Sequence, residues 1–152
     1  MTDLCIQSHG GSFSLRAACL ILREGRALLV NNQRLQCLYT VGGRIRQGES
    51  SAEAARRECL EETGCPLEPE RLVFVQERFY TADGCEHHEV VFFYLMQGDT
   101  TALAPGIQTD QAAESLCWVP LSSLPELNLL PPFLKNGLQA LPGGVQHIVT
   151  RE

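Results

Sequence analysis

Short apolar runs separated by turn signals make up most of this chain. Runs rich in β-branched and aromatic residues, with alternating or continuous apolar positions, are typical of strands, and Gly, Pro and Asp between them mark turns. A polar loop is expected at 99–113 and a short helix at 131–141. We predict strands at 13–23, 26–31, 38–41, 71–80, 88–97, the first part of 116–124 (followed by a helical turn), and 145–150.

One segment has a different pattern. Helix-forming residues occupy nearly every position from 51 to 63. Ser50 followed by Glu53 predicts a capping box, in which the hydroxyl accepts the amide of residue 53 and the carboxylate reaches back. Gly64 suits the left-handed position that ends a helix, and Pro66 prevents its continuation. We therefore predict a helix over 51–63.

The order of these elements limits the fold class. Strands mixed with two helices, without a strand–helix–strand alternation, predict an α/β or α+β fold with a mixed sheet. No internal repeat and no Pro/Ser/Gly-rich linker divides the sequence, so we expect a single domain over residues 1–152.

The composition is that of an ordinary globular protein, with 44% hydrophobic and 20% charged residues among 152. The net charge of −6 argues against duplex nucleic acid as a partner, because such proteins neutralise phosphates with basic residues. The first residues lack a signal-peptide pattern, and the longest apolar runs are too short to span a membrane. We expect a cytoplasmic protein that acts without a membrane, and a homodimer is one option at this size.

The chain has seven cysteines, an odd number, and none has CxxC spacing. Paired ligand spacing is what a structural zinc site requires, so the sequence does not favour one. We interpret these cysteines as small buried hydrophobic residues in a reducing cytoplasm.

Three glutamates gather on one face of the predicted helix. Glu58, Glu61 and Glu62 are related as i, i+3 and i+4, a spacing at which like charges repel by a few tenths of a kcal/mol. An acidic helix face is most often simply solvated, yet divalent cations would offset the repulsion, since Mg²⁺ prefers oxygen ligands. Arg57 lies just off this face, where it can pair with a carboxylate. A stripe of small residues beside it, Ala52, Ala55 and Cys59, is expected to pack against the sheet.

The surrounding sequence contains a longer motif. From Gly43 it reads GRIRQGESSAEAARRECLEETGC, in which fixed Gly, Glu, Arg and Gly positions frame the three glutamates. It resembles the Nudix hydrolase signature, G-x5-E-x7-R-E-U-x-E-E-x-G-U, at all seven fixed positions. A chance match at one start is about one in 10⁸ at ordinary residue frequencies. The departures are Cys59 and Cys65, which stand where the family has bulky apolar residues.

The resemblance implies the Nudix fold, a mixed sheet sandwiched between helices, and hydrolysis of a nucleoside diphosphate linked to another group with Mg²⁺ or Mn²⁺. Glu58, Glu61 and Glu62 match the family's metal-binding and water-activating carboxylates. The resemblance also implies a carbonyl ligand from Gly42 or Gly43, and a brace between Arg57 and Glu49 that supports the loop and the helix.

Residues outside the motif are expected to complete the site. Glu89 and Glu114 are candidates for an additional base or ligand, although either could be an ordinary surface residue. Trp118 is expected in the core, and His87 and His88 on an exposed loop. Aromatic residues that could stack on a nucleobase are Tyr39, Phe79, Tyr80 and Phe93.

Three functions remain open at this stage. The first is a pyrophosphohydrolase acting on a nucleoside di- or triphosphate. The second takes ADP-ribose, a dinucleoside polyphosphate or a nucleotide sugar. The third is a Nudix-fold nucleotide sensor without turnover, which the complete set of carboxylates makes the least favoured.

Overall fold

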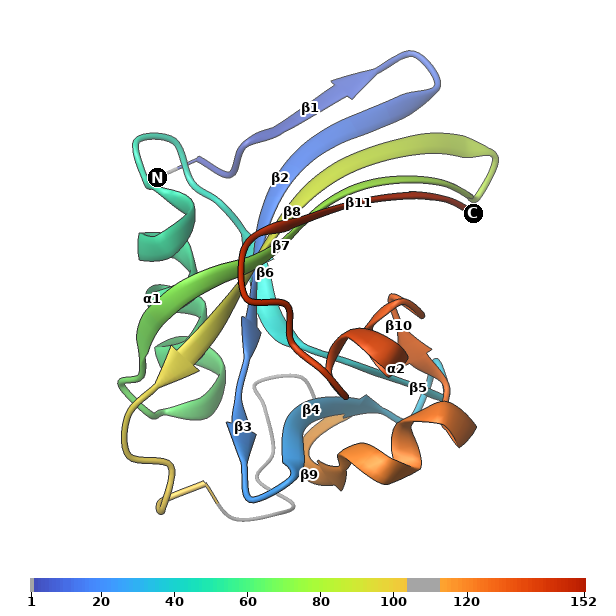
Figure 1. Ribbon diagram of the computed structural model, residues 1–152. Coiled ribbons are helices and arrows are strands. Elements are labelled where there is room, and N and C mark those ends of the chain that lie inside the picture. The colour runs from blue at the N-terminus through green and yellow to red at the C-terminus, as the bar shows by residue number, and fades with distance from the viewer. Residues whose placement is uncertain (1, 104–112) are drawn as a thin grey trace.

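The computed structural model describes residues 2–103 and 113–152, which form two β-sheets and two α-helices (Figure 1). One sheet has the order β1-β2-β8-β7-β11, with β6 also paired to β2. Strands β2 and β8 run parallel, as do β7 and β11, and the other pairs are antiparallel. Its strands are β1 (Cys5–Ser8), β2 (Gly11–Leu20), β6 (Val41–Arg44), β7 (Glu68–Ala82), β8 (Cys85–Gln97) and β11 (Gln146–Arg151).

The second sheet is smaller and lies below the first in Figure 1. Its order is β10-β5-β4-β3, with β9 paired to β4, and only β5 and β10 run parallel. Its strands are β3 (Leu22–Arg23), β4 (Arg26–Asn32), β5 (Cys37–Tyr39), β9 (Glu114–Pro120) and β10 (Leu129–Leu130).

Helices lie on both sides of the larger sheet, as the fold-class prediction requires. Helix α1 (Ser51–Thr63) packs against β6, β2, β7 and β8. On the other side lie a 3₁₀ segment, η1 (Leu121–Glu126), and the short α2 (Leu134–Gly137) (Figure 1). Within the described residues no helix has the length and apolar character needed to cross a membrane.

The alternation of strand side chains divides the core into two clusters. On β2, Ala17 and Cys19 face the cluster under α1, whereas Ala18 and Leu20 face the cluster under η1 and α2. Trp118 is buried in the first cluster, as predicted, and its Nε1 donates a hydrogen bond to the Leu103 carbonyl.

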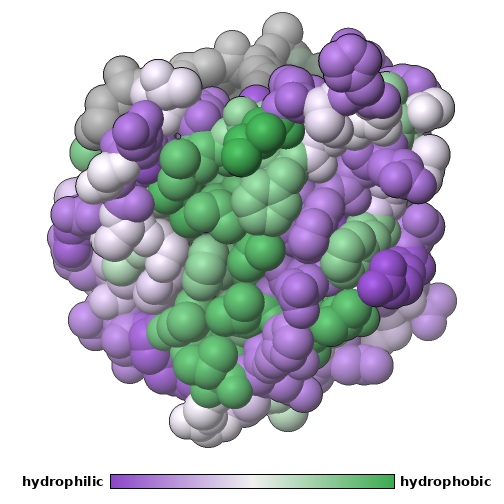
Figure 2. Space-filling model, turned by 90° about the horizontal axis from the view of Figure 1, so that it is seen from above, coloured by the Kyte–Doolittle hydropathy of each residue, from purple (hydrophilic) through white to green (hydrophobic). Residues whose placement is uncertain are grey.

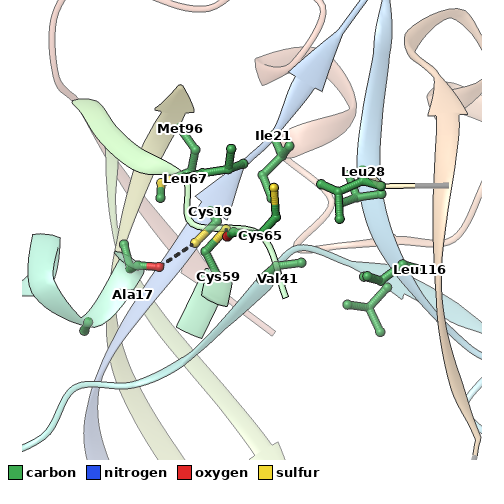
Figure 3. Close-up of a cluster of buried hydrophobic side chains, with 14 of the residues drawn as sticks. Ala17, Cys19, Ile21, Leu28, Val41, Cys59, Cys65, Leu67, Met96 and Leu116 are labelled. Carbon is green, nitrogen blue, oxygen red and sulfur yellow. Dashed lines mark hydrogen bonds between the residues drawn. The ribbon is translucent and has the colours of Figure 1, made fainter. Parts of the chain in front are cut away.

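The two cysteines of the sequence motif belong to the cluster under α1. Figure 3 shows Cys59 and Cys65 among Cys19, Leu67 and Met96. Both are buried, so they fill positions where an aliphatic side chain would also fit. All seven cysteines, each in the described part of the chain, are free thiols, but Cys85 is exposed and does not fit the prediction of buried cysteines.

The predicted helix is confirmed to the residue. Its N-cap Ser50 forms the capping box with Glu53, and Gly64 ends the helix in the left-handed conformation. The buried stripe differs from the prediction, since Ala54 is fully buried in place of Ala52 and Thr63 is buried as well. The stripe consists of Ala54, Ala55, Cys59 and Thr63.

Most strands also lie where predicted, with differences at the weakest signals. The expected helix over 131–141 is only the four residues of α2, and the predicted strand over 13–23 is divided into β2 and β3. The predicted strand over 38–41 is also divided, into β5 and β6 of different sheets, and the short strands β1 and β10 were not predicted. Most of the predicted loop at 99–113 lies outside the described residues.

The upper side of the molecule in Figure 1 carries the larger sheet. Seen from above, this face shows a broad apolar band bordered by polar residues (Figure 2). Ile6 on β1 and Val149 on β11, at the two edges of the sheet, are 67% and 52% exposed.

Candidate active site

Two glycines bring strand β6 close to its neighbours on both sides. A Cβ on Gly42 would lie 2.3 Å from the Ala17 carbonyl oxygen of β2. A Cβ on Gly43 would lie 2.5 Å from the carboxylate of Glu58 on α1. The absence of side chains therefore lets the helix carboxylate lie directly against the strand backbone.

Arg57 links the loop before α1 to the acidic face of the helix. Its Nε and Nη2 donate to the two oxygens of Glu49 at 2.7 and 3.0 Å, a bidentate pair. Its Nη2 also donates to the Arg44 carbonyl at 3.0 Å. Its Nη1 lies 2.6 Å from Glu58 and 3.3 Å from Glu61. One guanidinium thus contacts three carboxylates and a backbone oxygen of β6.

These contacts set the charge state of the brace. Hydrogen bonds from Arg57 hold the pKa of Glu49 below its usual value, and the Arg46 amide donates to the same carboxylate at 2.9 Å. Interaction with Glu49 in turn raises the pKa of Arg57, so this pair stays ionised.

The three helix carboxylates differ in exposure. Glu61 is the most open, with 48% of its side chain exposed, and Arg46 lies 3.8 Å from it. Glu58 is 14% exposed and is held between Arg57 and Gly43. Glu62 is partly buried and is the one helix glutamate that lines the cleft described below.

Glu62 has a strongly perturbed acidity. Burial raises its pKa to about 8, and the nearby charges of Glu58 and Glu114 act in the same direction. A hydrogen bond from the Gly42 amide and the charge of Arg16 oppose this rise without cancelling it. A carboxyl group in this position holds a proton near neutral pH unless another cation replaces it.

The donor set fits a hard divalent cation. In the described part of the chain, no three acidic, His or Cys side chains already surround one point as a complete shell would. Mg²⁺ does not need such a shell, because it usually keeps several waters and joins one or two carboxylates to substrate phosphates. Glu58 lies close enough to Glu62 for its charge to raise the pKa of Glu62. The two carboxylates are therefore suitable oxygen donors for one cation.

A cleft of about 530 Å³ opens between the two sheets beside these groups. It contains several residues that the sequence analysis proposed, from both inside and outside the motif. Those that line it are Tyr39, Gly42, Gly43, Glu62, Tyr80, Glu89, Phe93 and Glu114.

The wall opposite α1 is formed by β7 and β8. Glu89 is buried there and accepts from Arg78 at 3.4 Å, from the Tyr80 hydroxyl at 3.3 Å and from Ser14 at 3.5 Å. Arg78 also lies over the Tyr80 ring and pairs with Glu152 at 2.9 Å. This carboxylate is therefore paired with a cation, unlike Glu62.

A third group of polar residues comes from the smaller sheet. The Tyr39 hydroxyl donates to Glu114, and Asn32 donates to both Tyr39 and Glu114 at 3.3 Å. Burial, followed by the hydrogen bond to Glu114, raises the pKa of Tyr39 to about 12. The hydroxyl therefore remains protonated and keeps its hydrogen bond to Glu114.

The structure does not bring every proposed residue into the cleft. Phe79 lies on the other face of β7, stacked on His88 at 4.1 Å and covered by Arg151 at 4.2 Å. It belongs to a separate groove at the ends of the strands. His87 and His88 are strand residues of β8 and not loop residues, and both are only partly exposed.

Six polar residues of the cleft were not predicted from the sequence: Arg16, Asn32, Arg34, Thr40, Gln76 and Arg78. Arg16, Gln76 and Arg78 lie within predicted strands, and Asn32 directly follows one. Strand alternation indicates that Gln76, Arg78 and Tyr80 share a face. It does not indicate that this face is the one that meets the helix carboxylates.

Comparisons with known proteins agree with this geometry. A family model described as the NUDIX domain matches residues 13–141. The human 8-oxo-dGDP phosphatase NUDT18 is 30% identical over 111 residues, which cover 71% of this chain and 32% of NUDT18. The chain thus spans about a third of the length of that curated relative.

Solved structures show the same fold. The mutator MutT protein from Bacillus halodurans has a TM-score of 0.66 at 18% identity, covering 88% of this chain and 86% of that one. The E. coli ORF135 protein has a TM-score of 0.61 at 20% identity, with 84% and 89% covered. A MutT NUDIX hydrolase from Burkholderia pseudomallei has a TM-score of 0.55 at 26% identity, with 72% and 84% covered.

Proposed function

The chain belongs to the Nudix hydrolase family, and from that membership we propose that it hydrolyses a pyrophosphate bond in a nucleoside di- or triphosphate, or in a nucleoside diphosphate derivative, with Mg²⁺. The environment of Glu62 supports this proposal most strongly. A partly buried carboxyl beside Glu58, with a pKa of about 8 and a place in the cleft, favours a bound cation. When bound, Mg²⁺ would activate water and stabilise the charge on the phosphates.

In this proposal the residues of the motif have two roles, metal binding and support of the metal ligands. Glu58, Glu61 and Glu62 hold the cation, with a backbone oxygen of Gly42 or Gly43 as an additional ligand. The ion pair of Arg57 and Glu49 connects the loop to the helix. Removal of either residue would therefore free the carboxylates to move.

The cleft supplies the binding surface for the nucleotide. Arg16 and Arg34 line it and are positioned to attract the phosphates. Tyr39 and Tyr80 line it too and are candidates to contact a base, whereas Phe93 is 1% exposed and belongs to the core. Glu89 and Glu114 face the cleft and remain candidates for an additional base or ligand. Mn²⁺ as an alternative metal, a cytoplasmic location, a single domain and a homodimer also remain predictions.

The name of the relative NUDT18 includes a substrate, and this substrate indicates which class to test first. NUDT18 is an 8-oxo-dGDP phosphatase, so we propose an oxidised guanine nucleotide ahead of ADP-ribose, dinucleoside polyphosphates and nucleotide sugars.

The experiment is a hydrolysis panel across these classes with Mg²⁺, Mn²⁺ or EDTA and mass-spectrometric identification of products. We expect turnover of at least one nucleotide that requires the metal and is lost in Glu61→Gln and Glu62→Gln. Tight nucleotide binding without turnover under either metal would favour the sensor instead, and unchanged turnover in both variants would refute the roles given to the carboxylates.

A further inference from the structure

Gln76 on β7 is a fully buried polar residue that lines the cleft. Its side chain is 1% exposed, and its Nε2 donates to the Thr150 hydroxyl of β11 at 2.9 Å. Its Oε1 is shielded from water and has no hydrogen-bond partner among the described residues. Buried amide oxygens nearly always have partners, so this one needs an explanation.

Its surroundings are apolar on one side and charged on the other. Along the same face of β7, Phe74 precedes it in the core, and Arg78 follows it in the Glu89 network. Its cross-strand neighbour on β8 is Val91, which lines the cleft as well. Gln76 therefore marks the place where the apolar core becomes the cleft wall.

Apolar residues line part of the same cleft. Ala18, Val91 and Phe93 line the cleft from the larger sheet, and Leu130 and Pro131 line it from the smaller one. A flat heteroaromatic ring can bury its faces against apolar side chains and still needs a hydrogen bond at its edge. A single carboxamide in an apolar wall can supply that hydrogen bond.

We propose that Gln76 reads the edge of the nucleobase, accepting an N–H donor of the base at Oε1 while Thr150 holds its Nε2. This inference rests on the proposed function and adds a specificity-determining residue to it. A base with an acceptor at the same position would leave two lone pairs facing each other in a dry site and would be rejected.

The chemistry of the bases predicts which nucleotides benefit. Guanine presents acceptors at N7 and O6, whereas adenine and cytosine present exocyclic amino donors. Oxidation of guanine at C8 places a hydrogen on N7 and converts that acceptor into a donor. Gln76 would therefore favour 8-oxoguanine over guanine if the N7 edge enters, and an amino base over its keto counterpart if the exocyclic edge enters.

The test compares three nucleotide pairs: 8-oxo-dGTP has a donor at N7 where dGTP has an acceptor, and ATP and CTP have an amino donor where ITP and UTP have a keto acceptor. We expect wild-type protein to prefer the donor member of at least one pair in kcat/KM, and Gln76→Leu to reduce that ratio about 10- to 100-fold. Gln7→Leu, a matched change on the exposed strand β1, should leave all ratios unchanged.

Calorimetric binding of non-hydrolysable analogues of the same pairs gives a readout that does not depend on turnover. A preference lost in Gln76→Leu supports the inference even if hydrolysis is absent, which would refute only the proposed function. Equal ratios in wild type and Gln76→Leu would overturn the inference even if hydrolysis is fast. Gln76→Met, which keeps the shape of the side chain, replaces Gln76→Leu if the latter does not fold.

Discussion

The two walls of the cleft are built in different ways. The α1 wall comes from one continuous segment, Gly42–Gly64, in which a loop and a helix carry all the charged groups. The opposite wall is assembled from β2 and from the hairpin of β7 and β8, and this hairpin is far from β2 in sequence. A local motif thus fixes the first wall, whereas strand pairing fixes the second.

The walls also differ in how their charges are compensated. On the opposite wall, Glu89 has Arg78 within 3.4 Å, and Arg78 has Glu152 as a second partner. On the α1 wall, Arg57 serves Glu49, Glu58 and Glu61 at once. The charged form of Glu62 is favoured by the Gly42 amide and by the charge of Arg16. The two walls therefore differ at Glu62, whose pKa stays raised despite the charge of Arg16, whereas Glu89 pairs directly with Arg78.

The largest test of this contrast replaces one carboxylate on each wall. We expect Glu62→Gln to reduce kcat/KM about 10²- to 10⁴-fold, because an amide neither binds the metal well nor accepts a proton. It should not lower the melting temperature, since burial already favours a neutral group there.

The matched change on the other wall is Glu89→Gln. We expect a loss of less than about tenfold in kcat/KM, because Arg78 keeps Glu152 as its partner. Steady-state kinetics on both variants measure the contrast, and equal losses would show that the two walls share the chemistry.

The next test replaces, one at a time, the arginine that pairs with the carboxylates of each wall. Arg57→Lys removes the bidentate contact with Glu49, and we expect metal affinity or activity to fall about 10- to 100-fold. Arg78→Lys should cost less, because Arg78 contacts none of the three glutamates of α1 and pairs with Glu89 and Glu152 instead. Activity measured against Mg²⁺ concentration separates the cases, since a metal-positioning role raises the half-saturating concentration. The same half-saturating concentration in wild type and Arg57→Lys would contradict that role.

A third test uses the acidity of Glu62. Its pKa in the folded protein is about 8, above the ordinary value of 4.5, so the folded state binds this proton more tightly than the unfolded state. The resulting stability is complete below pH 4.5, decreases as pH rises, and is lost above about pH 8.

Thermal melts in EDTA between pH 5 and 9 measure this effect. We expect the melting temperature to fall across the interval in wild type, and to fall less in Glu62→Gln and in wild type with saturating Mg²⁺. The variant is the control for other groups that titrate in this range. Identical slopes in wild type and variant would mean that Glu62 is not protonated near neutral pH.

The same contrast explains how much could be predicted from sequence. The capping box, Gly64 and the i, i+3, i+4 spacing are local features, so α1 was predicted with correct ends. The position of Phe79 depends on the pairing of β7 with β8 and β11, and it lies on the face away from the cleft. Gln76 has no sequence signal of its own, because its importance comes from the missing partner of a buried atom.

The smallest expected effect tests whether the α1 wall depends on the stability of its helix. Ser50 accepts the Glu53 amide at 3.2 Å, and Glu53 accepts the Ser50 amide at 2.7 Å. Ser50→Ala removes the first bond and should cost about 1 kcal/mol, or roughly 2–4 °C in melting temperature. The exposed Ser122 of η1 provides a matched Ser→Ala control, expected within about 0.5 kcal/mol of wild type.

We expect kcat/KM of Ser50→Ala to stay within about twofold of wild type, since the carboxylates are positioned by Arg57 and not by the cap. Denaturant unfolding and steady-state kinetics on the same preparations give the two quantities. If activity falls much further than twofold while the folded fraction remains complete, the start of α1 itself sets the geometry of Glu58 and Glu62. In that case the Arg57–Glu49 brace would be insufficient alone, and the capping box would have to be counted as part of the α1 wall.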